Sequence, residues 1–140
     1  MKNEFKLNVD AKLENLSQIA DFVTESARKF DLDEKSVFQL QLATDEVASN
    51  IILHGYTHDT GQIHLSCWRE DQKIKIQIED RGEPFDPLLV DTPNLNTSLE
   101  ERSPGGLGIH FLKTLTSSVD YEFKNGKNRL TISKDLTKEE

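Results

Sequence analysis

Cysteine and long apolar runs are almost absent from this chain of 140 residues. Its only cysteine, Cys67, can form no internal disulfide and cannot build a zinc site made of several thiolates. The apolar runs do not exceed three residues, as in Ile51–Leu53, whereas a membrane-spanning helix needs about 20. We therefore expect a protein of the reducing cytoplasm that does not enter a membrane.

Positive charge is also scarce, because 17 basic residues face 25 acidic ones and the net charge is −8. Binding to nucleic acid or to an anionic membrane surface needs a positive field, so neither is expected as a partner. The length suits a single domain over residues 1–140, large enough to bury about two-thirds of its unfolded surface.

Apolar periodicity predicts both strands and helices. Apolar residues that alternate with polar ones predict strands, and apolar residues spaced by three and four predict helices. Asp33 is placed to cap a helix, Gly55 to end it, and the pair Asn125-Gly126 predicts a tight hairpin. The strands are expected near residues 5–9, 63–67, 74–78, 119–123 and 130–132, and the helices over 13–30, from 34 to 55, and from 109.

One stretch, residues 81–104, lacks periodicity and contains all four prolines. A loop of this length inside a compact domain is uncommon and is often a functional lid. The order of strand, two helices, two strands, long loop, helix and two strands predicts a layered α+β fold rather than a doubly wound parallel sheet.

Glu46 and Asn50 form the first candidate site. They lie four residues apart on the second predicted helix, so their side chains share one face. A carboxylate and an amide oxygen side by side suit a hard cation such as Mg²⁺ together with a general base. An ordinary solvated helix face gives the same pattern.

Asp80 and Gly82 form the second, immediately after a predicted strand. An acid followed by glycine allows a ligand to approach the backbone, although a plain turn has the same composition. The third candidate site comprises Gly105, Gly106 and Gly108, which precede a predicted helix. Free N–H groups at the start of a helix can bind phosphate. Alternatively, the glycines serve only as a hinge. This third site matches neither the Walker A loop nor the Rossmann fingerprint.

Taken in order, the three groups resemble the boxes of the GHKL ATPase/kinase superfamily. Residues 42–56 are similar to its N box, residues 80–85 to its G1 box and residues 105–109 to its G2 box. The length and end-to-end match resemble the small stand-alone anti-sigma factor serine/threonine kinases of bacteria.

The resemblance implies the Bergerat ATP-binding fold. This is an α+β, two-layer α/β sandwich with a mixed, mostly antiparallel sheet of about five strands backed by three helices. Residues 88–104 would form the lid over ATP.

The resemblance also implies roles for individual residues. Asn50 would ligate Mg²⁺, Asp80 would accept a hydrogen bond from the adenine amino group, and Glu46 would be the catalytic base. Gly82 would let the ring sit close, and Arg102 would reach the γ-phosphate. The ATP-binding residues implied in this way are Asn50, Asp80, Gly82, Phe85, Arg102, Gly105, Gly106, Leu107 and Gly108.

The implied activity is phosphorylation of an anti-anti-sigma (STAS-type) protein by Mg-ATP, with a sigma factor as a further partner and a homodimer as the assembly. The alternative is a non-catalytic, nucleotide-gated protein that sequesters a sigma factor or another regulator. Glu46 favours the kinase, because a nucleotide sensor needs no base beside its metal ligand.

Overall fold

The computed structural model describes residues 4–56, 61–84, 112 and 114–136. Strand β1 (Glu4–Asp10) is followed by helices α1 (Leu16–Lys29) and α2 (Glu34–Asn50). The remaining strands are β2 (Gln62–Glu70), β3 (Lys73–Asp80), β4 (Ser118–Lys124) and β5 (Lys127–Asp135). All the predicted strands are present, and α1 and α2 form where the apolar spacing predicts them.

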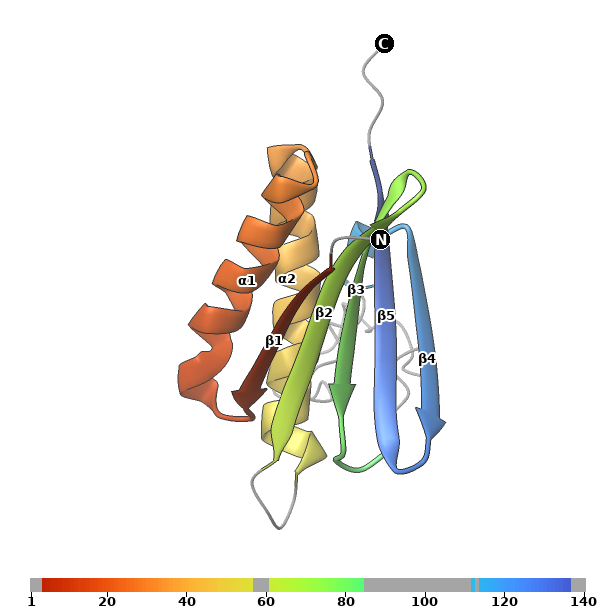
Figure 1. The fold of residues 1–140 in the computed structure, drawn as a ribbon. Helices are drawn as coiled ribbons and strands as arrows, with labels where there is room; N and C mark the ends of the chain where they lie inside the picture. Colours follow the sequence, from red (N-terminus) through yellow and green to blue (C-terminus); the bar gives the residue numbers. More distant parts are fainter. Residues whose placement is uncertain (1–3, 57–60, 85–111, 113, 137–140) are drawn as a thin grey trace, which may run out of the picture.

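The sheet has five strands in the order β1-β2-β3-β5-β4, with both helices on one face (Figure 1). Every pairing between these strands is antiparallel, so the expectation of a mixed sheet is wrong for the described residues. Of the third predicted helix, the described residues Leu112, Thr114 and Leu115 are helical, and most of residues 109–113 lie outside the described part. The α+β two-layer fold is confirmed.

The core lies between the helices and one face of the sheet. Alternation along each strand sends its apolar residues to this face, and the register continues the same face from strand to strand, as in the pairing of Ile76 with Ile132. Cys67 is fully buried here, as the sequence predicts. The central buried side chains are Ile19, Val23, Leu40, Ala43, Ile63, Leu65, Ile74, Ile76, Ile78 and Ile132.

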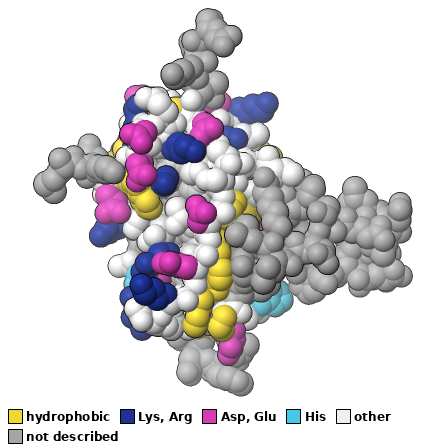
Figure 2. All heavy atoms as spheres, turned by 90° about the vertical axis from the view of Figure 1, so that its right-hand side faces the viewer, with side chains coloured by type: hydrophobic (Ala, Val, Ile, Leu, Met, Phe, Trp, Pro, Cys, Tyr) yellow, Lys and Arg dark blue, Asp and Glu magenta, His cyan; other side chains and the backbone are white. Residues whose placement is uncertain are grey.

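The opposite face of the sheet is polar. On β3 it carries Lys75, Gln77 and Glu79, and Arg129 of β5 pairs with Glu79 at 3.0 Å. Figure 2 looks from the β4 side and shows Lys, Arg, Asp and Glu side chains mixed over the surface beside a strip of hydrophobic side chains. None of the helices among the described residues is long and apolar enough to cross a membrane.

Local signals explain where α2 starts and where the second hairpin turns. The Asp33 carboxylate accepts a hydrogen bond from the Ser36 N–H at 3.1 Å, which caps α2 as predicted. Asn125 and Gly126 both have positive φ, 56° and 77°, so this predicted turn is confirmed. Helix α2 continues through a single π turn, Ile51–Gly55, and Gly55 ends it without positive φ. The predicted helix end is therefore correct, but no left-handed glycine forms it.

Candidate active site

The Glu46–Asn50 pair lies on the last turns of α2. The Asn50 amide nitrogen donates to Glu46 Oε1 at 3.4 Å, and both side chains are half-buried. Because this amide uses its nitrogen toward Glu46, its carbonyl oxygen takes no part in that hydrogen bond. No described residue donates to that oxygen. The four-residue spacing thus brings together the two side chains that the sequence singles out.

Burial changes the basicity of Glu46. Removal of the carboxylate from water raises its pKa, the neighbouring Asp45 carboxylate raises it further, and the hydrogen bond from Asn50 opposes both effects. Burial raises the pKa of Asp45 as well. A carboxylate with a raised pKa takes up a proton more readily, which suits a general base.

Asp80 stands at the end of β3, on the core side of the sheet, and is only 4% exposed. Its Oδ1 accepts from the Gly82 N–H at 2.8 Å and from the Asn128 amide at 3.1 Å. Within the described part of the chain nothing donates to its other oxygen, Oδ2. A buried carboxylate oxygen without a donor is costly, and a ligand N–H could satisfy it.

The pKa of Asp80 is raised, first by its removal from water and then by the adjacent Glu79. The hydrogen bonds from Gly82 and Asn128 act in the opposite direction and favour the charged carboxylate. A buried carboxyl group with a shifted pKa at a strand end, beside a glycine, is a candidate for a binding site.

Gly82 joins the two groups. An ideal Cβ placed on Gly82 would lie 2.5 Å from the carbonyl oxygen of Gly55, at the end of the π turn. The Glu83 N–H donates to that same carbonyl at 2.7 Å. The loop after β3 therefore contacts the end of α2 backbone to backbone, and this contact places Asp80 beside the helix that carries Glu46 and Asn50. In the described structure, the Gly55 carbonyl leaves no room for a side chain at residue 82.

Tyr56, which the sequence analysis missed, also ties these parts together. Its hydroxyl accepts from the Arg81 N–H and donates to the Gln62 carbonyl, each at 2.8 Å. It thereby links the residue after the π turn to the starts of β2 and of the loop after β3. Its pKa is raised mainly by burial.

Asn128 is the second residue that the sequence analysis missed. It lies on β5 directly opposite Asp80 and is 6% exposed. Its position was visible in the sequence, because residues 128, 130 and 132 alternate and the other two are apolar. A polar residue at an inward position of a strand indicates a site or a buried network.

The remaining predicted site residues cannot be placed. Phe85, Arg102, Gly105, Gly106, Leu107 and Gly108, and the proposed lid at residues 88–104, lie outside the described residues. The site as described therefore contains one base candidate, one metal-ligand candidate and one buried acceptor, all predicted, with Gly82 between them.

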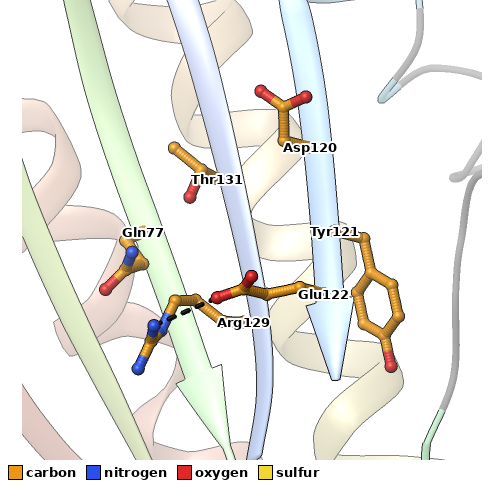
Figure 3. Close-up of a pocket in the computed structure, with 6 residues that line it drawn as sticks. All are labelled: Gln77, Asp120, Tyr121, Glu122, Arg129 and Thr131. Carbon is orange, nitrogen blue, oxygen red and sulfur yellow. Dashed lines mark hydrogen bonds and ion pairs between the residues drawn. The ribbon is translucent and has the colours of Figure 1, made fainter. Parts of the chain in front are cut away.

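A separate hollow of about 300 Å³ lies at β3, β4 and β5 (Figure 3). Strand alternation places most of its side chains on the polar face of the sheet, away from Asp80. The Arg129 guanidinium within it already pairs with Glu122 and with Glu79. It is lined by Gln77, Asp120, Tyr121, Glu122, Arg129 and Thr131.

The chain is similar in sequence to known proteins. Residues 9–134 match the family described as the histidine kinase-like ATPase domain. The Serine/threonine-protein kinase BtrW of Bordetella bronchiseptica is 31% identical over 97 residues, which are 69% of this chain and 68% of that protein. The Anti-sigma F factor of Clostridium acetobutylicum is 25% identical over 134 residues, 96% of this chain and 94% of that one.

A solved structure shares the fold. It contains the RsbU and RsbW domains of a Mycobacterium tuberculosis protein, and it aligns with a TM-score of 0.72 at 16% identity. The alignment covers 98% of this chain and 33% of that one, so this chain spans about a third of the solved protein.

Proposed function

The chain belongs to the histidine kinase-like ATPase domain family, and from that membership we propose that it is a serine/threonine protein kinase of the anti-sigma factor type that uses Mg-ATP. The observation that carries the proposal is the Glu46–Asn50 pair on a helix whose end contacts the loop after the buried Asp80. In this proposal Glu46 and Asn50 would serve the phosphate end of the site as general base and metal ligand, and Asp80 would accept from adenine at the other end.

Asp80 would bind the adenine end. Its Oδ2 would accept a hydrogen bond from the exocyclic amine of adenine, which satisfies the buried oxygen. Guanine carries a carbonyl oxygen at the corresponding position, so two acceptors would face each other. An unmet buried acceptor costs about 1–3 kcal/mol, which corresponds to a preference for ATP of up to about a hundredfold.

Asn50 would hold Mg²⁺. Its carbonyl oxygen is the type of ligand that Mg²⁺ takes, and its amide nitrogen is already turned to Glu46. No cluster of three or more His, Cys, Asp or Glu side chains suited to a metal occurs among the described residues. One side-chain ligand fits a Mg²⁺ ion that takes its other ligands from phosphates and water. When bound, the ion would neutralise phosphate charge.

Glu46 would act as the general base. As a serine or threonine oxygen of the protein substrate forms its bond to the γ-phosphorus, the hydroxyl proton passes to the Glu46 carboxylate. The bond from that phosphorus to the bridging oxygen breaks, and ADP leaves with the electron pair. Glu46 lies on the α-helix before the π turn that ends at Gly55, so the proposal puts the phosphate end of the site on α2 and the adenine end beside the π turn.

The proposed protein substrate is an anti-anti-sigma protein of the STAS type, with a sigma factor as a second partner. Relatives named as an anti-sigma factor and as serine/threonine kinases support this choice. We also propose a homodimer, because β1 is an edge strand of the sheet formed by the described residues, and another copy can pair with that edge. Light scattering at tens of micromolar would test the dimer against the 16.0 kDa monomer.

Phosphate transfer is the decisive test. The purified chain is incubated with Mg²⁺, γ-labelled ATP and the STAS-type protein from the same genome, and label on serine or threonine is measured. The proposal expects transfer that stops on chelation of Mg²⁺. Tight ATP binding without transfer to the STAS protein would instead support the non-catalytic, nucleotide-gated function.

A further inference from the structure

We propose that Asn128 is a positioning residue that sets the preference for the adenine base, by holding one oxygen of Asp80 so that the other is presented to the nucleotide. This inference rests on the proposed function, because it assumes that Asp80 accepts from the base. It assigns a role to a strand residue outside the three motifs, which would act through Asp80 without touching the nucleotide.

The Asn128 amide nitrogen lies among three acceptors. It lies 3.1 Å from Asp80 Oδ1, 3.2 Å from the Gly82 carbonyl and 3.0 Å from the Glu83 carbonyl. All three partners are acceptors, and they belong to the strand end and the loop that would carry the base. The two hydrogens of one buried NH₂ group are thus shared among three acceptors, which ties the Asp80 carboxylate to the backbone after it.

Hydrogen bonds at both ends of the Asn128 amide fix its orientation. The Tyr121 hydroxyl donates to Asn128 Oδ1 from β4. If the amide were flipped, its oxygen would face three acceptors. Its nitrogen would then face the Tyr121 hydroxyl, which would lose the oxygen to which it donates. The hydroxyl and the three acceptors therefore specify the same orientation, with the nitrogen toward Asp80.

The two oxygens of the Asp80 carboxylate differ in their hydrogen-bond donors. Oδ1 receives both the Gly82 N–H and the Asn128 amide, so it is already committed. Oδ2 is the oxygen left for the exocyclic amine of adenine. A base with a carbonyl there meets an acceptor that cannot turn away, because Asn128 and the Gly82 N–H together hold the carboxylate. Without Asn128 only the Gly82 N–H restrains it, so the carboxylate can rotate more freely and the penalty against the wrong base falls.

The experiment compares two nucleotides that differ at the group in question. ATP has the exocyclic amine, whereas inosine triphosphate has a carbonyl oxygen in its place. Dissociation constants of both, with Mg²⁺, are measured by calorimetry on the parent, Asn128→Ala and Tyr121→Phe. Thr131→Ala is the matched control, because it lies on the same strand but lines the hollow on the polar face. Circular dichroism checks the fold of each variant.

The parent should prefer ATP, and Asn128→Ala should lower the ATP-to-ITP affinity ratio by about tenfold, the value of one hydrogen bond to a charged group. Tyr121→Phe removes the hydroxyl that helps to orient the Asn128 amide, so it should lower the ratio in the same direction by a smaller factor, and it supplies the test if the alanine variant does not fold. Thr131→Ala should leave the ratio unchanged.

A role in folding alone would lower the affinities for both nucleotides equally. An unchanged ATP-to-ITP affinity ratio in folded Asn128→Ala or Tyr121→Phe would therefore overturn the inference. A parent that binds ATP and ITP with equal affinity would also overturn it, while leaving nucleotide binding intact. A parent that binds neither would overturn the proposed function and this inference with it.

Discussion

The carbonyl oxygen of Gly55 lies 2.5 Å from the point where a Cβ on Gly82 would stand. That distance is shorter than any contact a real Cβ makes, and the obstructing atom belongs to the backbone. The end of the helix that carries Glu46 and Asn50 and the loop that follows Asp80 are therefore held at a separation that only glycine permits.

Gly82→Ala should consequently force this loop away from Gly55. We expect the free energy of unfolding to fall by about 1–3 kcal/mol, as for other overpacked sites, and ATP affinity to fall with it. Urea denaturation and calorimetry measure the two effects. Gly126→Ala is the control: its positive φ strains alanine, but nothing lies within 4 Å of its Cβ. It should lose stability and, where folded, bind ATP like the parent.

Glu46→Gln should separate binding from chemistry. Glutamine keeps the size and the acceptor for Asn50 but cannot take a proton at neutral pH. Since a positioned base contributes about 10²–10⁴-fold in rate, we expect phosphate transfer to fall at least about a hundredfold while ATP affinity changes little. Single-turnover assays with labelled ATP measure the rate, and parental transfer in the glutamine variant would rule out Glu46 as the base.

Asn50→Ala should instead lose the dependence of binding on Mg²⁺. The alanine removes the carbonyl oxygen that would ligate the ion and also the amide that donates to Glu46. ATP titrations with Mg²⁺ and with EDTA should then give similar, weakened affinities, together with a loss of transfer. A variant that keeps the parental gain in affinity on adding Mg²⁺ would show that the ion is held elsewhere.

The buried Asp80 predicts a pH dependence of stability. Burial and the adjacent Glu79 raise its pKa in the folded state above the ordinary value of about 4. Between these two pKa values the folded protein binds more protons than the unfolded one, so the free energy of unfolding falls as pH rises. This contribution is fully present below the ordinary pKa and is lost as pH rises through the raised one.

The measurement is urea unfolding of the parent and of Asp80→Asn at several pH values from about 4 to 7. The asparagine variant lacks this titration, so the difference in free energy between the two proteins should change with pH in the stated direction. Tyr56 does not titrate in this range, because its pKa is raised from an ordinary value of about 10. Parallel pH curves would contradict a raised pKa at Asp80.

The regular elements were predictable because each depends on local chemistry. Alternation gave the strands, the buried face of α2 followed from its spacing, and Asn125-Gly126 specified its own turn. The sequence could not show that all described strand pairs are antiparallel, since pairing direction depends on how distant segments meet. Nor could it show that Gly55 ends a π turn without the left-handed conformation usual for a terminal glycine.

The candidate residues could be named from the sequence, but the residues that support them could not. Glu46 and Asn50 stand out by their four-residue spacing, Asp80 by its position before Gly82 at the end of a strand, and all three by the resemblance of their motifs to one family. Asn128 contacts Asp80, which is 48 residues away along the chain, and Tyr56 contacts Arg81, which is 25 residues away. A local sequence pattern cannot show which distant residue is the partner. Only the pairing of β3 with β5 puts Asn128 opposite Asp80.

That pairing has a consequence for how the molecule opens. The sheet contains two local hairpins, β2–β3 with β1 added at its outer edge and β5–β4, joined along the seam between β3 and β5, with Asp80 on one side and Asn128 on the other. A nucleotide held at Asp80 would bind only while the seam is closed, and at a hundred times its dissociation constant it would stabilise that closed state by about 2.7 kcal/mol. Amide hydrogen exchange along β5 should therefore slow in step with nucleotide concentration, so the C-terminal hairpin becomes a reporter of occupancy even though it carries none of the three sequence motifs.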